Sequence, residues 1–74
     1  MIINLSTQEA LTVNEADEIA EFLNDSKLEY FSITPLIDGI GYYNMEAQSE
    51  DGTEIRQLSG FLDMMHIAHK IEVD

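Results

Sequence analysis

The chain of 74 residues contains no cysteine and only three basic residues against fifteen acidic ones. Without cysteine, it has neither a disulfide framework nor a thiolate metal site. The segment Met1-Ile2-Ile3-Asn4-Leu5 is too short and too poor in basic residues to act as a signal peptide. No apolar run is long enough to span a bilayer. From these absences we expect a cytoplasmic protein that does not enter a membrane.

The sequence also lacks the motifs of the common enzyme classes. It has no glycine-rich phosphate loop, no Gly-x-Ser-x-Gly nucleophile elbow and no EF-hand calcium loop. The serines lie in contexts typical of turns, strands or helix caps. Because fifteen carboxylates always produce close pairs, paired acids do not indicate a glycosidase. We therefore expect a protein without enzymatic activity and without a cofactor.

The negative charge is spread along the whole chain. The formal net charge is −12, with seven acids and one lysine in residues 1–37 and eight acids and two bases in residues 38–74. The hydrophobic share of 45% is ordinary for a globular protein. Residues 1–74 are thus predicted to form a single acidic interaction domain. Its surface would repel nucleic acid and anionic membranes and attract basic partners.

The first half of the chain predicts a strand, a helix and two further strands. Residues 1–5 favour a short strand, or alternatively an extended arm. Thr12 and Glu15 fit a capping box, and the helix that follows has apolar residues at helical spacing up to a stop at 24–26. Strands are predicted near residues 30–35 and 42–48, where β-branched and aromatic residues or alternating apolar and polar residues occur.

The second half predicts a third hairpin strand and a final helix. Glu50-Asp51-Gly52 is typical of a hairpin turn, which would lead into a strand at 53–59. Ser59 would then cap a helix over 60–73. The predicted order is β-α-β-β-β-α. This is an α+β fold in which two helices pack on one face of an antiparallel sheet of three to four strands.

The stretch NEADEIAEFLND places acids along the solvent side of the first helix without any base. Acids one helical turn apart repel each other by roughly 0.2–0.5 kcal/mol per pair. One interpretation is a solvated face that keeps a small protein in solution. The other is a surface that binds a basic partner, because carboxylates at this spacing imitate the phosphates of a nucleic-acid strand.

Aromatic residues and turn acids extend the second interpretation. Phe31 and Tyr43 are predicted to lie in the core, whereas Tyr30 and Tyr42 are predicted to face outward and to anchor a partner. The predicted partner-binding residues are therefore Glu15, Asp17, Glu18, Glu21, Asp25, Tyr30, Tyr42, Glu50 and Asp51.

Asp63, His66 and His69 recur every three residues in the predicted last helix. At 100° per residue the outer two point about 120° apart, and a catalytic metal site needs three converging ligands. Asp63, His66 and Lys70 instead fit one polar stripe, with the lysine near the helix C-terminus. We expect no metal site here.

In size, acidity and lack of cysteine, the chain resembles small acidic inhibitors encoded by phages and mobile elements. Those include anti-CRISPR and anti-restriction proteins that mimic nucleic acid. The resemblance implies an inhibitor that binds the basic surface of a nucleic-acid-binding protein or complex. One alternative is an accessory subunit or homodimer, joined through a free sheet edge or the methionine-rich helix, whose acidity serves solubility only. A further alternative is a metal-dependent protein that uses His66 and His69.

Overall fold

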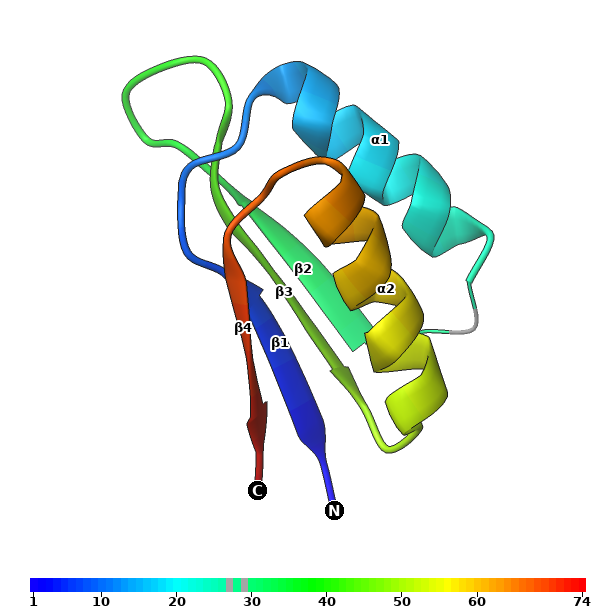
Figure 1. Cartoon of the computed structure of the whole chain (residues 1–74). Helices are drawn as coiled ribbons and strands as arrows, with labels where there is room; N and C mark the ends of the chain where they lie inside the picture. The colour runs from blue at the N-terminus through cyan, green and yellow to red at the C-terminus, as the bar shows by residue number, and fades with distance from the viewer. Residues whose placement is uncertain (27, 29) are drawn as a thin grey trace.

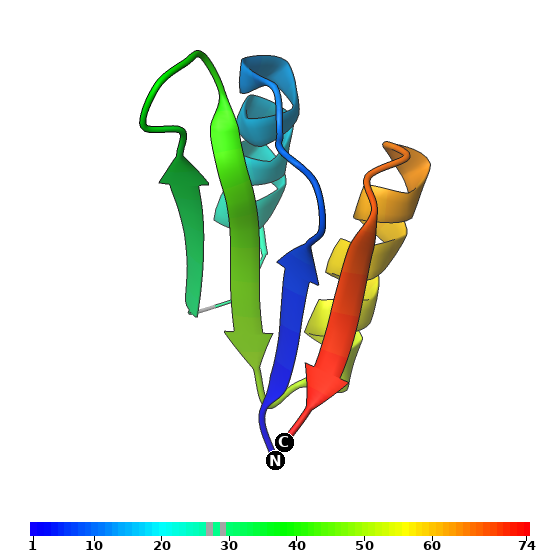
Figure 2. The ribbon, with the colours of Figure 1, turned by 90° about the vertical axis from the view of Figure 1, so that its left-hand side faces the viewer.

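The computed structural model describes residues 1–26, 28 and 30–74. The elements in chain order are β1 (Ile3–Thr7), α1 (Val13–Asn24), β2 (Tyr30–Pro35), β3 (Tyr42–Ser49), α2 (Gly52–Met64) and β4 (His69–Val73). The strands form one antiparallel sheet in the order β2-β3-β1-β4. Both helices lie on the same face of this sheet (Figures 1 and 2). The predicted α+β class, the antiparallel sheet and the placement of the helices are thus confirmed.

The order β-α-β-β-α-β is that of the ferredoxin-like, or split β-α-β, arrangement. The two chain ends meet at one end of the sheet, where the Asp74 N–H donates to the Ile2 carbonyl at 3.1 Å (Figure 2). This arrangement supports many unrelated functions, so the function has to be argued from the surface of the molecule.

Helix α1 begins at the capping box that the sequence predicts. The Glu15 N–H donates to Thr12 Oγ1 at 3.1 Å, and the Thr12 N–H donates to Glu15 Oε1 at 2.8 Å. Ala16, Ile19 and Leu23 form its buried stripe. The helix ends at Asn24, within the predicted stop. Both ends of α1 and its inward face are thereby confirmed.

The element predicted after β3 is wrong, because residues 53–59 form a helix and not a strand. Asp51 acts as the N-cap of α2, where its Oδ1 accepts from the Thr53 N–H at 2.9 Å. Ile55, Leu58 and Leu62 then recur at helical spacing and are buried. An Asx residue before glycine suits a hairpin turn as well as a helix start, so the same signal led to the wrong element.

The predicted final helix over 60–73 is also wrong, since α2 ends at Met64. His66 adopts a left-handed backbone conformation with φ 59°, which turns the chain back toward the sheet. Ile67 is buried beyond this turn, and His69–Val73 pair with β1 as the edge strand β4. Ser59, predicted as a helix cap, consequently lies inside α2.

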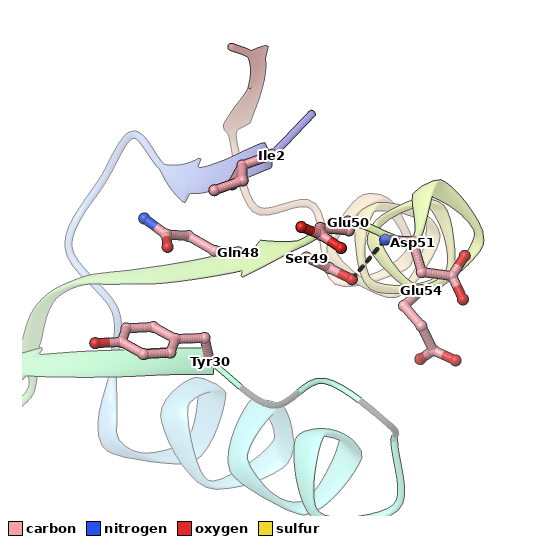
Figure 3. A pocket seen from close by; sticks show the side chains of 7 residues that line it. All are labelled: Ile2, Tyr30, Gln48, Ser49, Glu50, Asp51 and Glu54. Carbon is pink, nitrogen blue, oxygen red and sulfur yellow. Dashed lines mark hydrogen bonds between the residues drawn. The ribbon is translucent and has the colours of Figure 1, made fainter.

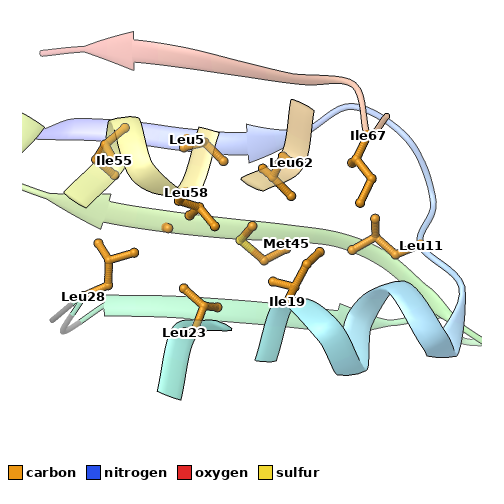
Figure 4. Packing of buried hydrophobic residues seen from close by; sticks show 11 residues of the cluster. Leu5, Leu11, Ile19, Leu23, Leu28, Met45, Ile55, Leu58, Leu62 and Ile67 are labelled. Carbon is orange, nitrogen blue, oxygen red and sulfur yellow. The ribbon is translucent and has the colours of Figure 1, made fainter. Parts of the chain in front are cut away.

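The core lies between the helices and the sheet (Figure 4). It consists of the buried residues Leu5, Leu11, Ile19, Leu23, Leu28, Met45, Ala47, Ile55, Leu58, Leu62 and Ile67. Thr7 is buried among them and is satisfied, because its Oγ1 accepts from the Met45 N–H at 3.0 Å. One layer of apolar side chains therefore holds both helices and leaves the other face of the sheet open.

Candidate partner-binding surfaces

The outer face of α1 carries the acids that the sequence predicts there. Four of them are exposed, namely Asp17, Glu18, Glu21 and Asp25. The fifth, Glu15, is half-buried because its side chain caps the start of the helix. Within residues 1–26, 28 and 30–74, none of these carboxylates has an ion-pair partner. Asp17, Glu21 and Asp25 are successive neighbours one turn apart and repel each other. The helix therefore presents a row of negative charge that no base among the described residues pairs with.

An aromatic pair lies beside this acidic row. Phe22 of α1 and Phe61 of α2 stack with ring centroids 4.6 Å apart and an interplanar angle of 14°. They line an open cleft of about 330 Å³ whose other lining residues are Glu18, Glu21 and Asp25. Carboxylates around an aromatic floor suit an arginine or lysine side chain, whose stem is apolar and whose end is cationic. Sequence reasoning missed this contact because it joins two helices that are far apart in the chain.

Three other predicted residues lie together in a separate pocket. Tyr30, Glu50 and Asp51 line a cavity of about 370 Å³ with Ile2 and Glu54 (Figure 3). The Asp51 carboxylate already caps α2, and the Asp51 N–H donates to Ser49 Oγ at 2.9 Å. Glu50 and Glu54 supply the remaining negative charge of the pocket.

The structure does not bring this pocket together with the α1 acids. Tyr30 is paired with Gln48 across β2 and β3, and side chains at paired positions lie on the same face of a sheet. The neighbouring pair, Phe31 and Ala47, faces the helices, where Ala47 is buried. Tyr30 therefore lies on the open face, opposite α1, and the predicted residues form two groups rather than one patch.

Tyr42 and Tyr43 are exchanged relative to the prediction. Tyr42 is half-buried against the core, and Tyr43 is 64% exposed. The cause is a bulge: Thr34 pairs with Asn44 and Pro35 pairs with Tyr42, which leaves Tyr43 as an extra residue in β3. The extra residue reverses the alternation expected from the sequence. Tyr42 is therefore a packing residue in this structure, held at its backbone by Leu11.

The other two aromatic predictions have different outcomes. Tyr30 is 71% exposed, as predicted. Phe31, predicted to lie in the core, is 40% exposed. It faces the helix side of the sheet, but β2 is an edge strand and the helices cover it incompletely.

The open face of the sheet is less acidic than α1. On β4, Lys70 Nζ lies 2.6 Å from Glu72 Oε1. The hydrogen bond from Lys70 and its positive charge hold the pKa of the Glu72 carboxyl below its usual range. Any stability from this pair is present above the unfolded pKa of Glu72 and is lost as the pH falls through the lower folded value. The pair is exposed to solvent, where ion pairs contribute little.

The histidines that suggested a metal lie in different surroundings. His66 is exposed in the turn after α2, whereas His69 lies in β4. The described part of the chain has no group of three or more His, Cys, Asp or Glu side chains placed to share a metal ion. The predicted polar stripe of Asp63, His66 and Lys70 on one helix is wrong, because the helix ends before His66.

His69 instead joins β4 to α2. Its Nδ1 lies 2.9 Å from the Ile67 carbonyl, which can only accept, so in the neutral ring Nδ1 carries the hydrogen. Its Nε2 then accepts from Ser59 Oγ at 2.7 Å. Asp63 Oδ1 lies farther away, 3.8 Å from the same nitrogen. Sequence reasoning missed this pair because it placed Ser59 at the cap of a helix that would continue through His69, about three turns away.

We expect Ser59→Ala to lower the free energy of unfolding by about 1 kcal/mol, because it leaves the nearly buried Nε2 without its hydrogen bond. Urea denaturation measures the change. Ser32→Ala, at an exposed position of β2, is the matched control and should stay within about 0.5 kcal/mol of the parent. Equal effects of the two substitutions would contradict a stabilising role for the Ser59–His69 contact.

Neither a membrane-spanning helix nor a similarity to known proteins identifies the function of this chain. In the part of the chain that the structure describes, neither helix has the length and apolar character needed to cross a membrane. The chain has no significant match to any protein-family model, to any curated protein or to any solved structure.

Proposed function

We propose that this protein is a non-enzymatic, cytoplasmic inhibitor that binds the basic surface of a larger protein through the outer face of α1. In its most specific form, the proposal is that it occupies a nucleic-acid-binding site as a charge mimic, as phage- or mobile-element-encoded anti-CRISPR proteins do. The same charge opposes direct binding to nucleic acid or to an anionic membrane.

The observation that carries the proposal is the row of carboxylates on α1, none of which has an ion-pair partner within the part of the chain that the structure describes. Neighbouring like charges destabilise a helix, and Glu–Lys pairs at the same spacing would stabilise it. Carboxylates one turn apart stand about 5–6 Å from each other, which resembles the repeat of charge along a nucleic-acid backbone. A basic partner would remove the repulsion, and its arginine and lysine side chains would pair with the acids.

The cleft of Phe22 and Phe61 adds an anchor to this surface. An arginine side chain over the rings would gain a cation–π contact and would donate charge-assisted hydrogen bonds to the carboxylate of Glu18 or Asp25. The row alone attracts any cation, whereas the cleft favours a side chain of defined length and shape. The proposed interface therefore combines long-range attraction with one specific contact.

The test is a charge reversal on α1, Glu18→Lys with Glu21→Lys, measured by fluorescence anisotropy against a labelled arginine-rich peptide at low salt. We expect the affinity to fall at least several-fold and its salt dependence to weaken. The matched control is Glu9→Lys with Glu46→Lys, which changes the net charge equally beside the open face of the sheet. Equal losses in both variants would show that only the total charge matters and would contradict the proposed interface.

A specific observation also favours the accessory-subunit or homodimer alternative. Edge strand β4 exposes Ile71 and Val73, and an unpaired strand edge can add a strand from another chain. In that case acidity serves solubility only. Sedimentation velocity distinguishes the two functions, because a stable dimer that is unaffected by salt supports this alternative and a monomer supports the basic-surface proposal.

A further inference from the structure

We infer that the loop of residues 36–41 between β2 and β3 is an apolar anchor, which inserts Ile37 and Ile40 into an apolar pocket bordered by arginine or lysine on a partner protein. The inference rests on the proposed function and adds to it the part of the interface that does not depend on charge. None of the predicted partner-binding residues lies in this loop.

The two isoleucines are almost completely exposed. Ile37 is 97% exposed and Ile40 is 91% exposed, and both lie in one loop that projects from the body of the molecule (Figure 1). Single exposed apolar residues are common on protein surfaces. Ile37 and Ile40 are separated only by Asp38 and Gly39, so this part of the loop, called the apolar tip below, carries two large exposed β-branched side chains. Such a tip gains most when a partner removes it from water.

Backbone hydrogen bonds fix the base of the loop, although the side chains of Ile37 and Ile40 are almost fully exposed. The Leu36 N–H donates to the Gly41 carbonyl at 3.2 Å, which closes the loop. Leu11 and Tyr42 exchange two backbone hydrogen bonds, each 2.8 Å long. Gly41 lies so close to this bridge that a Cβ atom there would be 2.7 Å from the Leu11 carbonyl oxygen. A tip on a fixed base loses little conformational entropy on binding, which favours affinity.

Charge identifies the kind of partner. Leu11 lies two residues before α1, so the loop base is joined to the helix start, and Figures 1 and 2 place the loop and the first turn of α1 at the same end of the molecule. Asp17 and Glu18 are exposed within the first two turns. An anionic bilayer would be repelled by a net charge of −12, and so would a second copy of the chain. A protein pocket that is apolar inside and basic at its rim fits both features.

The experiment compares two labelled peptides of equal positive charge, one with leucines between its arginines and one with serines in the same places. We expect the parent protein to bind the leucine peptide about ten-fold or more tightly. The variant Ile37→Ser with Ile40→Ser should lose this preference and keep its salt dependence. Its far-ultraviolet circular dichroism and thermal unfolding should match the parent, because both side chains are outside the core.

The control is Met64→Ser with Val73→Ser, which removes two exposed apolar side chains at other places and should keep the preference. If the Ile37/Ile40 variant also keeps it, while charge reversal on α1 abolishes binding, the inference is wrong and the proposed function stands. If the parent shows no salt-dependent binding to either peptide, the proposed function itself fails. Isoleucine-dependent binding to phosphatidylcholine vesicles, or an isoleucine-dependent dimer in sedimentation, would overturn the assignment of the tip to a basic protein partner.

Discussion

Replacing Leu58 with alanine is expected to lower the free energy of unfolding by about 2–5 kcal/mol. Leu58 is fully buried at the centre of the core, where α2 packs on the sheet (Figure 4). Alanine would remove its apolar contacts and leave a cavity that a rigid sheet cannot close. A domain of this size is stable by roughly 4–11 kcal/mol, so the loss is a large part of the total.

Urea denaturation measures this loss, and Gln57→Ala is the matched control. Gln57 is the neighbouring residue of α2 and is exposed, so its replacement should change stability by less than about 0.5 kcal/mol. The comparison also tests the corrected secondary structure, since only the observed elements bury Leu58 inside a helix that covers the sheet. A Leu58 variant as stable as the Gln57 variant would contradict this packing.

Replacing Gly41 with alanine is expected to destabilise the fold by about 1–3 kcal/mol from backbone strain alone. Gly41 has φ 121°, a conformation that residues with a Cβ rarely adopt. The new Cβ would in addition lie 2.7 Å from the Leu11 carbonyl oxygen, which is itself held by the Tyr42 N–H. The substitution therefore acts on the bridge that fixes the loop to the segment before α1.

Gly60→Ala is the opposite case in the same chain. Gly60 lies inside α2, and a Cβ there would have no neighbour within 4 Å. Alanine should therefore raise stability by about 0.5–1 kcal/mol through its better helix propensity. Thermal unfolding of both variants checks the pair of predictions. A Gly41 variant that is as stable as the parent would contradict the close approach of the loop base to Leu11.

The parts of the fold that the sequence predicts correctly are those set by local signals. Short stretches of sequence determine three of these features. They are the capping box of Thr12 and Glu15, the apolar stripe of α1 and the alternating strand near Met45. The segment after Asp51 failed because its first residues suit two structures. Ile55, Leu58 and Leu62 show a helical period, but the turn-like sequence before them favoured a hairpin.

The acidic row of the candidate site follows from a local pattern, whereas its other contacts do not. The acids of α1 were predicted to face solvent because helical spacing places them opposite the buried stripe. The stacking of Phe22 on Phe61 requires both helices to be correctly assigned and packed. The exchange of Tyr42 and Tyr43 comes from one extra residue in β3, and alternation cannot show a bulge. Ile37 and Ile40 lie in a loop, where no periodicity separates exposed from buried residues.

The proposed interface on α1 is tested by affinity capture of partners from lysate of the native host, with the protein immobilised. Binding takes place at low salt, elution uses high salt, and mass spectrometry identifies what elutes. We expect recovery of one nucleic-acid-binding protein or complex, which salt releases and which added DNA or RNA displaces. Its recovery should be lost with Glu18→Lys and Glu21→Lys and retained with Glu9→Lys and Glu46→Lys. Recovery of the chain alone, or of a partner unaffected by salt and nucleic acid, would contradict the proposed interface.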